Sequence, residues 1–128
     1  MKLISACLLG IECAWSGDVR YSSDRAIELA KVEALIPVCP EQLGGLPTPR
    51  VPQEIQGGTG EDVLDKKCTV LNKNGEDVTK EFIQGADETL KIAKQLNIKE
   101  FICKSSPTSA VLNLGRGSPE CKVYTTFL

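Results

Sequence analysis

The sequence predicts an α/β fold, namely a small three-layer, Rossmann-like domain with a mostly parallel sheet flanked by helices. Short apolar runs at residues 2–6, 35–38 and 100–104 are bounded by glycine, proline or polar residues, as interior strands are. Stretches with helical periodicity, near 22–34 and 79–96, separate these runs. Since a helix between two strands returns the chain to the same end of the sheet, this alternation favours parallel strands.

The N-terminal elements follow from local signals. The strand at 2–6 runs into a long polar loop. Ser22 or Ser23 can cap the helix that follows, and Asp24 in its first turn complements the positive end of the helix dipole. The strand at 35–38 comes next.

Residues 39–60 contain four of the seven prolines and five of the eleven glycines. This composition predicts a long loop without regular structure. Such loops are uncommon inside a compact domain and usually have a function. We therefore expect binding residues in this segment.

The second half begins with a strand at 68–71 and a tight turn at Asn74-Gly75. Asp77 or Thr79 is expected to cap the strongest helix, which Asn97 ends before the strand at 100–104. The apolar face of that helix comprises Phe82, Ile83, Ala86, Leu90 and Ala93. The tail at 123–128 fits a short helix or a short strand equally well.

Length and composition restrict the function. The 128 residues predict one domain, 1–128, and 41% hydrophobic residues suffice for a core without disulfides. A net charge of −2 gives no electrostatic reason to expect nucleic acid or an anionic membrane as partner. The chain has no histidine, which excludes a Ser-His-Asp triad, a Cys-His pair and a His-bound zinc.

Six cysteines are present, and no two of them are separated by only two residues. The spacing therefore lacks the pattern of a zinc ribbon or of a thioredoxin-like redox motif. No full secretory signal is recognisable. We expect a cytoplasmic protein with reduced thiols.

Three chemically active segments follow predicted strands directly. Cys7 follows the first strand, Cys39 the second, and the segment 105–109 follows the strand at 100–104. The carboxyl ends of parallel strands meet at one edge of a sheet, where α/β proteins bind their ligands. We therefore expect one pocket there, with Glu41 beside Cys39.

Four stretches in register resemble one known family. They are Ser5-Ala6-Cys7-Leu8-Leu9-Gly10 with Cys13, Pro37-Val38-Cys39-Pro40-Glu41 with Gly44-Gly45-Leu46-Pro47-Thr48-Pro49-Arg50, Gly75-Glu76-Asp77-Val78-Thr79 with Phe82 and Gly85-Ala86, and Lys104-Ser105-Ser106-Pro107. The family was once called domain of unknown function 523 and is now typified by thiouracil desulfurase. The similarity extends over nearly the whole chain.

The resemblance implies a [4Fe-4S] enzyme in which three cysteines hold the cluster and one iron stays open. That iron would bind the sulfur of a thiolated pyrimidine as a Lewis acid, without redox chemistry. By position, Cys7 and Cys39 are the metal ligands and Ser109 occupies the third cofactor-binding position. Glu41 and Ser105 are the candidate catalytic residues, with Glu41 able to move a proton.

This chain departs from the family pattern at the third ligand. The family has Ser-Pro-Ser-Cys-Gly where this sequence has Ser106-Pro107-Thr108-Ser109-Ala110, so a hard hydroxyl replaces a soft thiolate. Either Cys13, Cys103 or Cys121 replaces that thiolate, or the protein is a non-catalytic family member without a cluster that binds a small molecule or a partner. A thiol-based redox sensor using Cys7 and Cys13 is a third interpretation.

Overall fold

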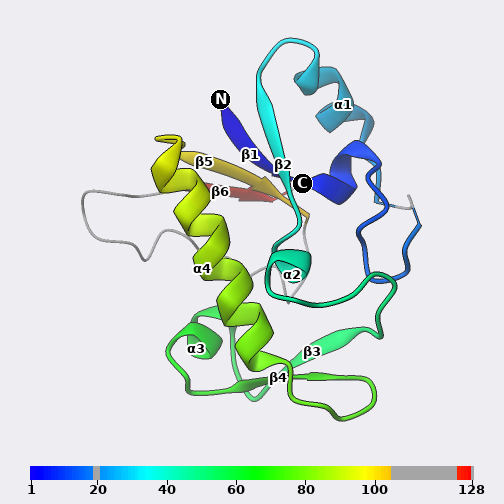
Figure 1. Cartoon of the computed structure of the whole chain (residues 1–128), viewed down its shortest axis with the longest axis vertical. Helices are drawn as coiled ribbons and strands as arrows, with labels where there is room; N and C mark the ends of the chain where they lie inside the picture. Colours follow the sequence, from blue (N-terminus) through cyan, green and yellow to red (C-terminus); the bar gives the residue numbers. More distant parts are fainter. Residues whose placement is uncertain (19–20, 105–123, 128) are drawn as a thin grey trace.

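The computed structural model of the chain describes residues 1–18 and 21–104 in full, together with the backbone of 124–127 (Figure 1). Its main sheet has the strand order β2-β1-β5-β6 over these residues, and all neighbouring strands are parallel. The predicted α/β fold with a mostly parallel sheet is therefore confirmed, and the tail forms a strand. The strands are β1 (Lys2–Ser5), β2 (Leu35–Val38), β5 (Glu100–Cys103) and β6 (Tyr124–Phe127).

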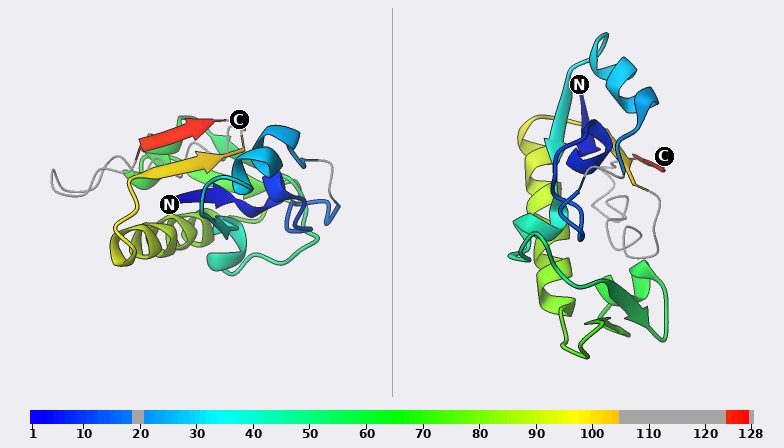
Figure 2. Two further views of the ribbon diagram at one scale, coloured as in Figure 1. Left: turned by 90° about the horizontal axis from the view of Figure 1, so that it is seen from above. Right: turned by 90° about the vertical axis from the view of Figure 1, so that its right-hand side faces the viewer.

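Helices cover both faces of the sheet, which gives the predicted three layers (Figure 2). Leu3 and Phe101 are fully buried on the face that packs against α4. Ile4 and Ile102 lie on the opposite face, in a core shared with Ala26 of α1. This burial on two sides explains why the strands are continuous apolar runs instead of alternating ones. The helices that cover the sheet are α1 (Asp24–Ala30) and α4 (Thr79–Gln95).

The predicted cap of α1 is confirmed, whereas neither Asp77 nor Thr79 is the N-cap of α4. Ser23 is the N-cap of α1, and its hydroxyl accepts the Ala26 N–H at 3.3 Å. Helix α4 begins at Thr79 after the N-cap Val78, and the Asp77 carboxylate accepts the Thr79 N–H at 2.9 Å. None of the described helices is both long and apolar enough to cross a membrane.

The prediction of an unstructured loop over 39–60 was wrong. The segment contains a short helix and a strand, and a capping box formed by Thr59 and Asp62 starts a further helix at its end. A strand of alternating exposure such as Gln-Glu-Ile-Gln gives a weak sequence signal. The elements are α2 (Pro40–Leu43), β3 (Gln53–Gln56) and α3 (Gly60–Leu64).

The strand predicted at 68–71 exists as β4 (Thr69–Asn72), but it does not join the parallel sheet. It pairs antiparallel with β3 in a separate two-stranded sheet. Val70 is buried there against Val63 and Phe82, beneath the N-terminal half of α4. The apolar run therefore predicted the strand correctly, but the sequence did not reveal its partner, because β3 was not recognised.

Two glycines let α2 cross α4 at backbone contact. A Cβ atom at Gly85 would lie 2.1 Å from the Pro40 carbonyl oxygen, and one at Gly44 would overlap the Glu81 carbonyl oxygen. No larger residue fits at either position without moving a helix. This crossing fixes the position of α2. It thereby also fixes Cys39 and Glu41, the two residues of the candidate site that lie at the start of this helix.

Candidate functional site

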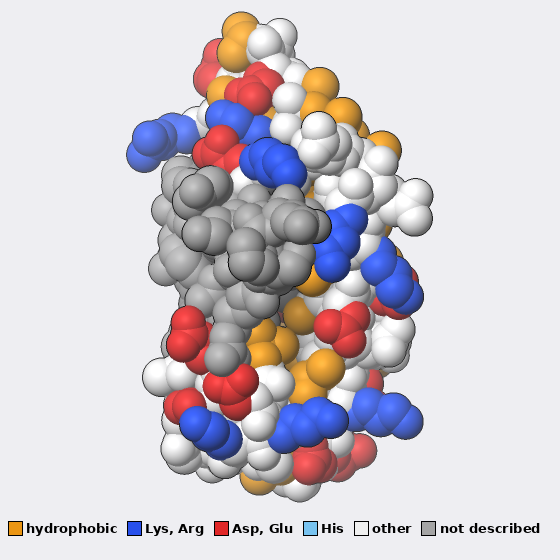
Figure 3. Space-filling view, turned by 90° about the vertical axis from the view of Figure 1, so that its left-hand side faces the viewer, with side chains coloured by type: hydrophobic (Ala, Val, Ile, Leu, Met, Phe, Trp, Pro, Cys, Tyr) orange, Lys and Arg blue, Asp and Glu red, His pale blue; other side chains and the backbone are white. Residues whose placement is uncertain are grey.

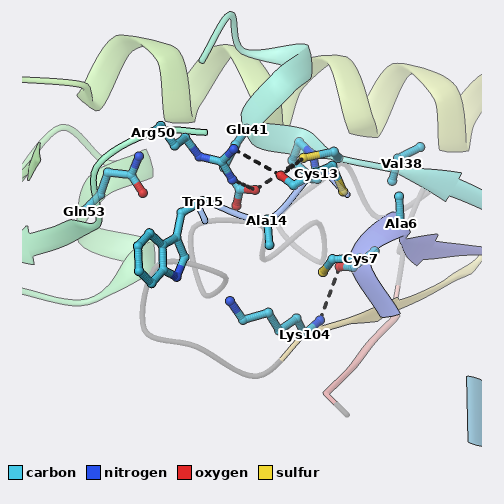
Figure 4. A pocket seen from close by; sticks show the side chains of 13 residues that line it. Ala6, Cys7, Cys13, Ala14, Trp15, Val38, Glu41, Arg50, Gln53 and Lys104 are labelled. Atoms are coloured by element: carbon cyan, nitrogen blue, oxygen red, sulfur yellow. Dashed lines mark hydrogen bonds and ion pairs between the residues drawn. The ribbon is translucent and has the colours of Figure 1, made fainter. Parts of the chain in front are cut away.

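A cavity lies where β1, β2 and β5 end, on the edge of the sheet that the sequence predicts (Figure 4). Its walls bring together segments that are far apart in the sequence. The lining side chains are Ser5, Ala6, Cys7, Cys13, Ala14, Trp15, Val38, Cys39, Pro40, Glu41, Arg50, Gln53 and Lys104. Three of these residues carry thiols and three carry charges.

Cys7 enters the cavity from a short 3₁₀ helix, Ala6–Leu9, that continues directly from β1. Gly10 ends this helix in the left-handed conformation (φ 84°), and its N–H bonds the Cys7 carbonyl oxygen at 3.1 Å. Glycine adopts that conformation without steric cost. The predicted strand at 2–6 is thus one residue shorter, and the turn aims the Cys7 side chain at the cavity.

Cys39 is the N-cap of α2, and Pro40 takes the first helical position, which tolerates proline. The Cys39 Sγ lies 3.5 Å from Glu41 Oε2 and 3.6 Å from the Cys13 carbonyl oxygen. Helix α2 starts at Pro40, between the two residues. The start of the helix therefore places the Cys39 thiol beside the Glu41 carboxylate.

Cys13 packs together with the other two thiols of the cavity. The residue is only 3% exposed and belongs to one cluster with Cys7 and Cys39. The sequence did not predict whether Cys13 faces the pocket, because a long polar loop has no periodic pattern that would assign its side chains to one face.

The three thiols differ in acidity. The hydrogen bond from Cys13, assisted by the Lys104 charge, lowers the pKa of Cys7 against the opposing effect of burial. The hydrogen bond with Cys39 lowers the pKa of Cys13. The bond to Cys7 together with burial outweighs this effect and raises that pKa to about 11. The bond to Cys13, burial and the Glu41 charge all raise the pKa of Cys39. Cys7 is therefore the first of the three to become a thiolate, the form that binds metal.

Glu41 and Arg50 form an ion pair in the wall of the cavity. Arg50 Nη2 donates to Glu41 Oε2 at 2.9 Å, and the two side chains are 6% and 22% exposed, respectively. Arg50 Nη1 also donates to the carbonyl oxygens of Cys13 and Pro47, at 3.1 and 3.2 Å. The guanidinium thus orients the carboxylate and holds the backbone that carries Cys13.

Lys104 closes the cavity from the end of β5. Its backbone N–H donates to the Ser5 hydroxyl at 3.2 Å, joining the ends of β5 and β1. Its Nζ lies 3.6 Å from the centre of the Tyr21 ring, a cation–π contact. The Tyr21 hydroxyl accepts a hydrogen bond from Trp15 Nε1 at 3.0 Å. Lys104 was not among the predicted site residues, although the strand-exit argument that selected Cys7 applies to it equally.

The structure places Cys7, Cys39 and Glu41 together on this cavity. Cys103 is fully buried in the core beneath α4, and its pKa is raised to about 12 by burial and the Glu41 charge. Cys68 contacts the Thr59 carbonyl oxygen beside α3. The remaining predicted positions, Ser105 and Ser109, lie outside the described residues, as does Cys121.

The donor set fits an iron–sulfur cluster better than a single ion. Over the residues that the structure describes, no three Cys, Asp or Glu side chains are arranged to hold one metal ion. In a cluster, each thiolate binds a different iron, so the sulfurs need not point at one centre. Three soft thiols on one cavity, with no competing histidine, match that chemistry.

The fold and the cavity define an α/β protein with a cysteine-lined pocket at the carboxyl edge of a parallel sheet. The chain belongs to the 2-thiouracil desulfurase family, whose model matches residues 3–124. It is 43% identical over 109 residues to an uncharacterised protein, YbbK, of Bacillus subtilis (strain 168), covering 85% of this chain and 72% of that protein. A solved structure described as a [4Fe-4S]-dependent thiouracil desulfidase, TudS, superposes with a TM-score of 0.74 at 26% identity, covering 98% of this chain and 88% of that one.

Proposed function

We propose that this protein removes the sulfur from a thiolated pyrimidine such as thiouracil, in a non-redox reaction that depends on a [4Fe-4S] cluster. One observation carries the proposal: Cys7 and Cys39, from different strand ends, line the same cavity as Glu41. The family and the description of TudS support the substrate class and the cofactor. The whole chain, 1–128, acts as one domain in this proposal, and a reducing cytoplasm would keep its thiols available.

When bound, the cluster would supply an open iron, a Lewis acid for the substrate sulfur. Cys7 and Cys39 would hold it, with Ser109 near the third position. The overall change is hydrolytic: the C=S carbon gains the oxygen of water, and the sulfur leaves as sulfide with two protons, so no electron donor is needed. Ser105 is proposed to contact the substrate.

Glu41 is the proposed proton carrier. Its Oε2 lies 3.5 Å from the Cys39 sulfur, so a substrate whose sulfur approaches metal held there would have this carboxylate beside it. The ion pair with Arg50 holds the carboxylate in one orientation. Glu41 would accept a proton from the attacking water and return it to the departing sulfur.

The test is anaerobic reconstitution with iron and sulfide, followed by assay of sulfide and uracil released from 2-thiouracil. Glu41→Gln keeps the shape and removes the proton acceptor, so the rate should fall about 100-fold or more while iron content stays unchanged. Glu54→Gln, at an exposed position of β3, is the matched control and should keep full activity. A cluster-loaded wild-type protein that releases no sulfide would overturn the proposal.

The non-catalytic interpretation has one observation in its favour, the serine at position 109. It expects no iron after reconstitution, together with binding of a small molecule in the same cavity. Iron content measured before any activity assay therefore separates the two interpretations.

A further inference from the structure

We propose that Cys13 supplies the third thiolate of the cluster in this chain. The inference rests on the cluster of the proposed function and adds the ligand that the sequence leaves undetermined at Ser109. It concerns metal binding alone and makes no claim about the substrate.

The first argument is position. Cys13 is the third thiol on the cavity, and it packs in one cluster with Cys7 and Cys39. A fourth thiol does not line the described walls. A metal group that binds Cys7 and Cys39 would therefore find its third thiol at Cys13, in the wall of the same cavity.

The second argument is that the Cys13 backbone is held in place. Its carbonyl oxygen lies within hydrogen-bond distance of three donors, at 3.1, 3.4 and 3.6 Å. Arg50 also donates its backbone N–H to the Trp15 carbonyl oxygen at 2.8 Å, so the two loops are joined at Cys13 and again two residues later. A ligand presented by a fixed backbone loses little freedom when metal binds. The three donors are Arg50 Nη1, Thr48 Oγ1 and Cys39 Sγ.

The third argument is that the other thiols among the described residues, Cys103 and Cys68, do not compete with Cys13 for the third ligand position. Cys103 is sealed beneath α4 with no exposed surface, and the core around it contains Leu3 and Phe101. Cys68 lies beside α3 and is absent from the cavity wall. Neither of the two is among the residues that line the cavity.

The test measures iron, acid-labile sulfide and visible absorption after anaerobic reconstitution of the full chain. Cys13→Ser, which keeps nearly the same size, should retain less than about a fifth of the wild-type iron. Cys68→Ser and Cys121→Ser are the matched controls and should retain all of it. Circular dichroism and thermal unfolding of each unloaded variant show whether the fold persists, and Cys13→Ala serves if Cys13→Ser does not fold.

A second variant tests the position that the family would use. Ser109→Cys should leave the iron content of the otherwise unchanged protein as it is, since Cys13 already fills the third position. In the Cys13→Ser background it should restore iron, because a thiolate then becomes available again. A rise in iron from Ser109→Cys alone would overturn the inference.

Failure of this inference differs from failure of the proposed function. Wild-type iron content in folded Cys13→Ser refutes the role of Cys13 and leaves desulfuration untouched. A loaded wild type that releases no sulfide, with iron lost in Cys13→Ser, refutes desulfuration and supports Cys13. Absence of iron from the wild type overturns both.

Discussion

The crossing of α2 and α4 is the most sensitive structural support of the site, and Gly85→Ala tests it. The added Cβ would lie 2.1 Å from the Pro40 carbonyl oxygen, whereas ordinary contact begins at 3.4 Å. The helices must therefore separate by about 1.3 Å, taking 3.4 minus 2.1, to accept one methyl group. The obstructing atom belongs to the backbone of α2, so no rotamer change relieves the clash.

The magnitude follows from two opposing effects. Overpacking costs about 1–3 kcal/mol, and a rigid backbone contact belongs at the upper end of that range. Alanine favours a helix interior over glycine by about 1 kcal/mol. The net loss in the free energy of unfolding is about 2 kcal/mol, which for a chain of this length lowers Tm by about 8 °C.

Urea denaturation followed by circular dichroism measures the loss. Asp87→Ala is the control, because Asp87 is exposed on the same helix and its stability change should stay within about 0.5 kcal/mol of zero. Gly85→Ala should also bind less iron, since α2 positions Cys39 and Glu41. If Gly85→Ala is as stable as the wild type or more stable, helix propensity outweighs the contact, and the reasoning about this crossing is wrong.

Three further predictions concern the charges, the thiols and the core. Arg50→Met should cost about 2 kcal/mol, because it leaves the partly buried Glu41 carboxylate unpaired, and adding Glu41→Gln should recover part of that loss in urea denaturation. The lowered pKa of Cys7 places thiolate formation below its ordinary value of 9.0, so alkylation of Cys7 by iodoacetamide should rise with pH to a midpoint below 9. Lys104→Met removes a favourable charge and should move that midpoint upward, while an unmoved midpoint contradicts the assigned cause. Thr89→Val should cost about 1 kcal/mol, since the buried Thr89 hydroxyl donates to the Gly85 carbonyl oxygen at 2.7 Å, and unchanged stability would show that this bond contributes nothing.

Strands buried on both faces could be predicted from the sequence because their signal is local. The central residues of β1, β2 and β5 are apolar on both faces, and these runs alternate with helices, so both their existence and their parallel pairing followed. The strand β3 could not be found in this way. Its residues are mostly polar, and it exists because β4 pairs with it and Ile55 packs under α4.

The same distinction applies to the site. Cys7, Cys39 and Glu41 follow strand ends directly, so the topology of the sheet brings them together. Cys13 and Arg50 lie in loops, and their positions depend on hydrogen bonds between segments 37 residues apart. Periodicity carries no information about such contacts.

The proposed role of Cys13 as the third ligand would explain how the site could hold a cluster with a serine at position 109. The Cys13 carbonyl oxygen is bound by the same Arg50 that orients Glu41. A change at Arg50 should therefore disturb the metal and the proton carrier together, whereas a change at Cys13 should disturb the metal alone. Comparing iron content and sulfide release in Arg50→Lys and Cys13→Ser distinguishes this arrangement from one in which the two functions have separate supports.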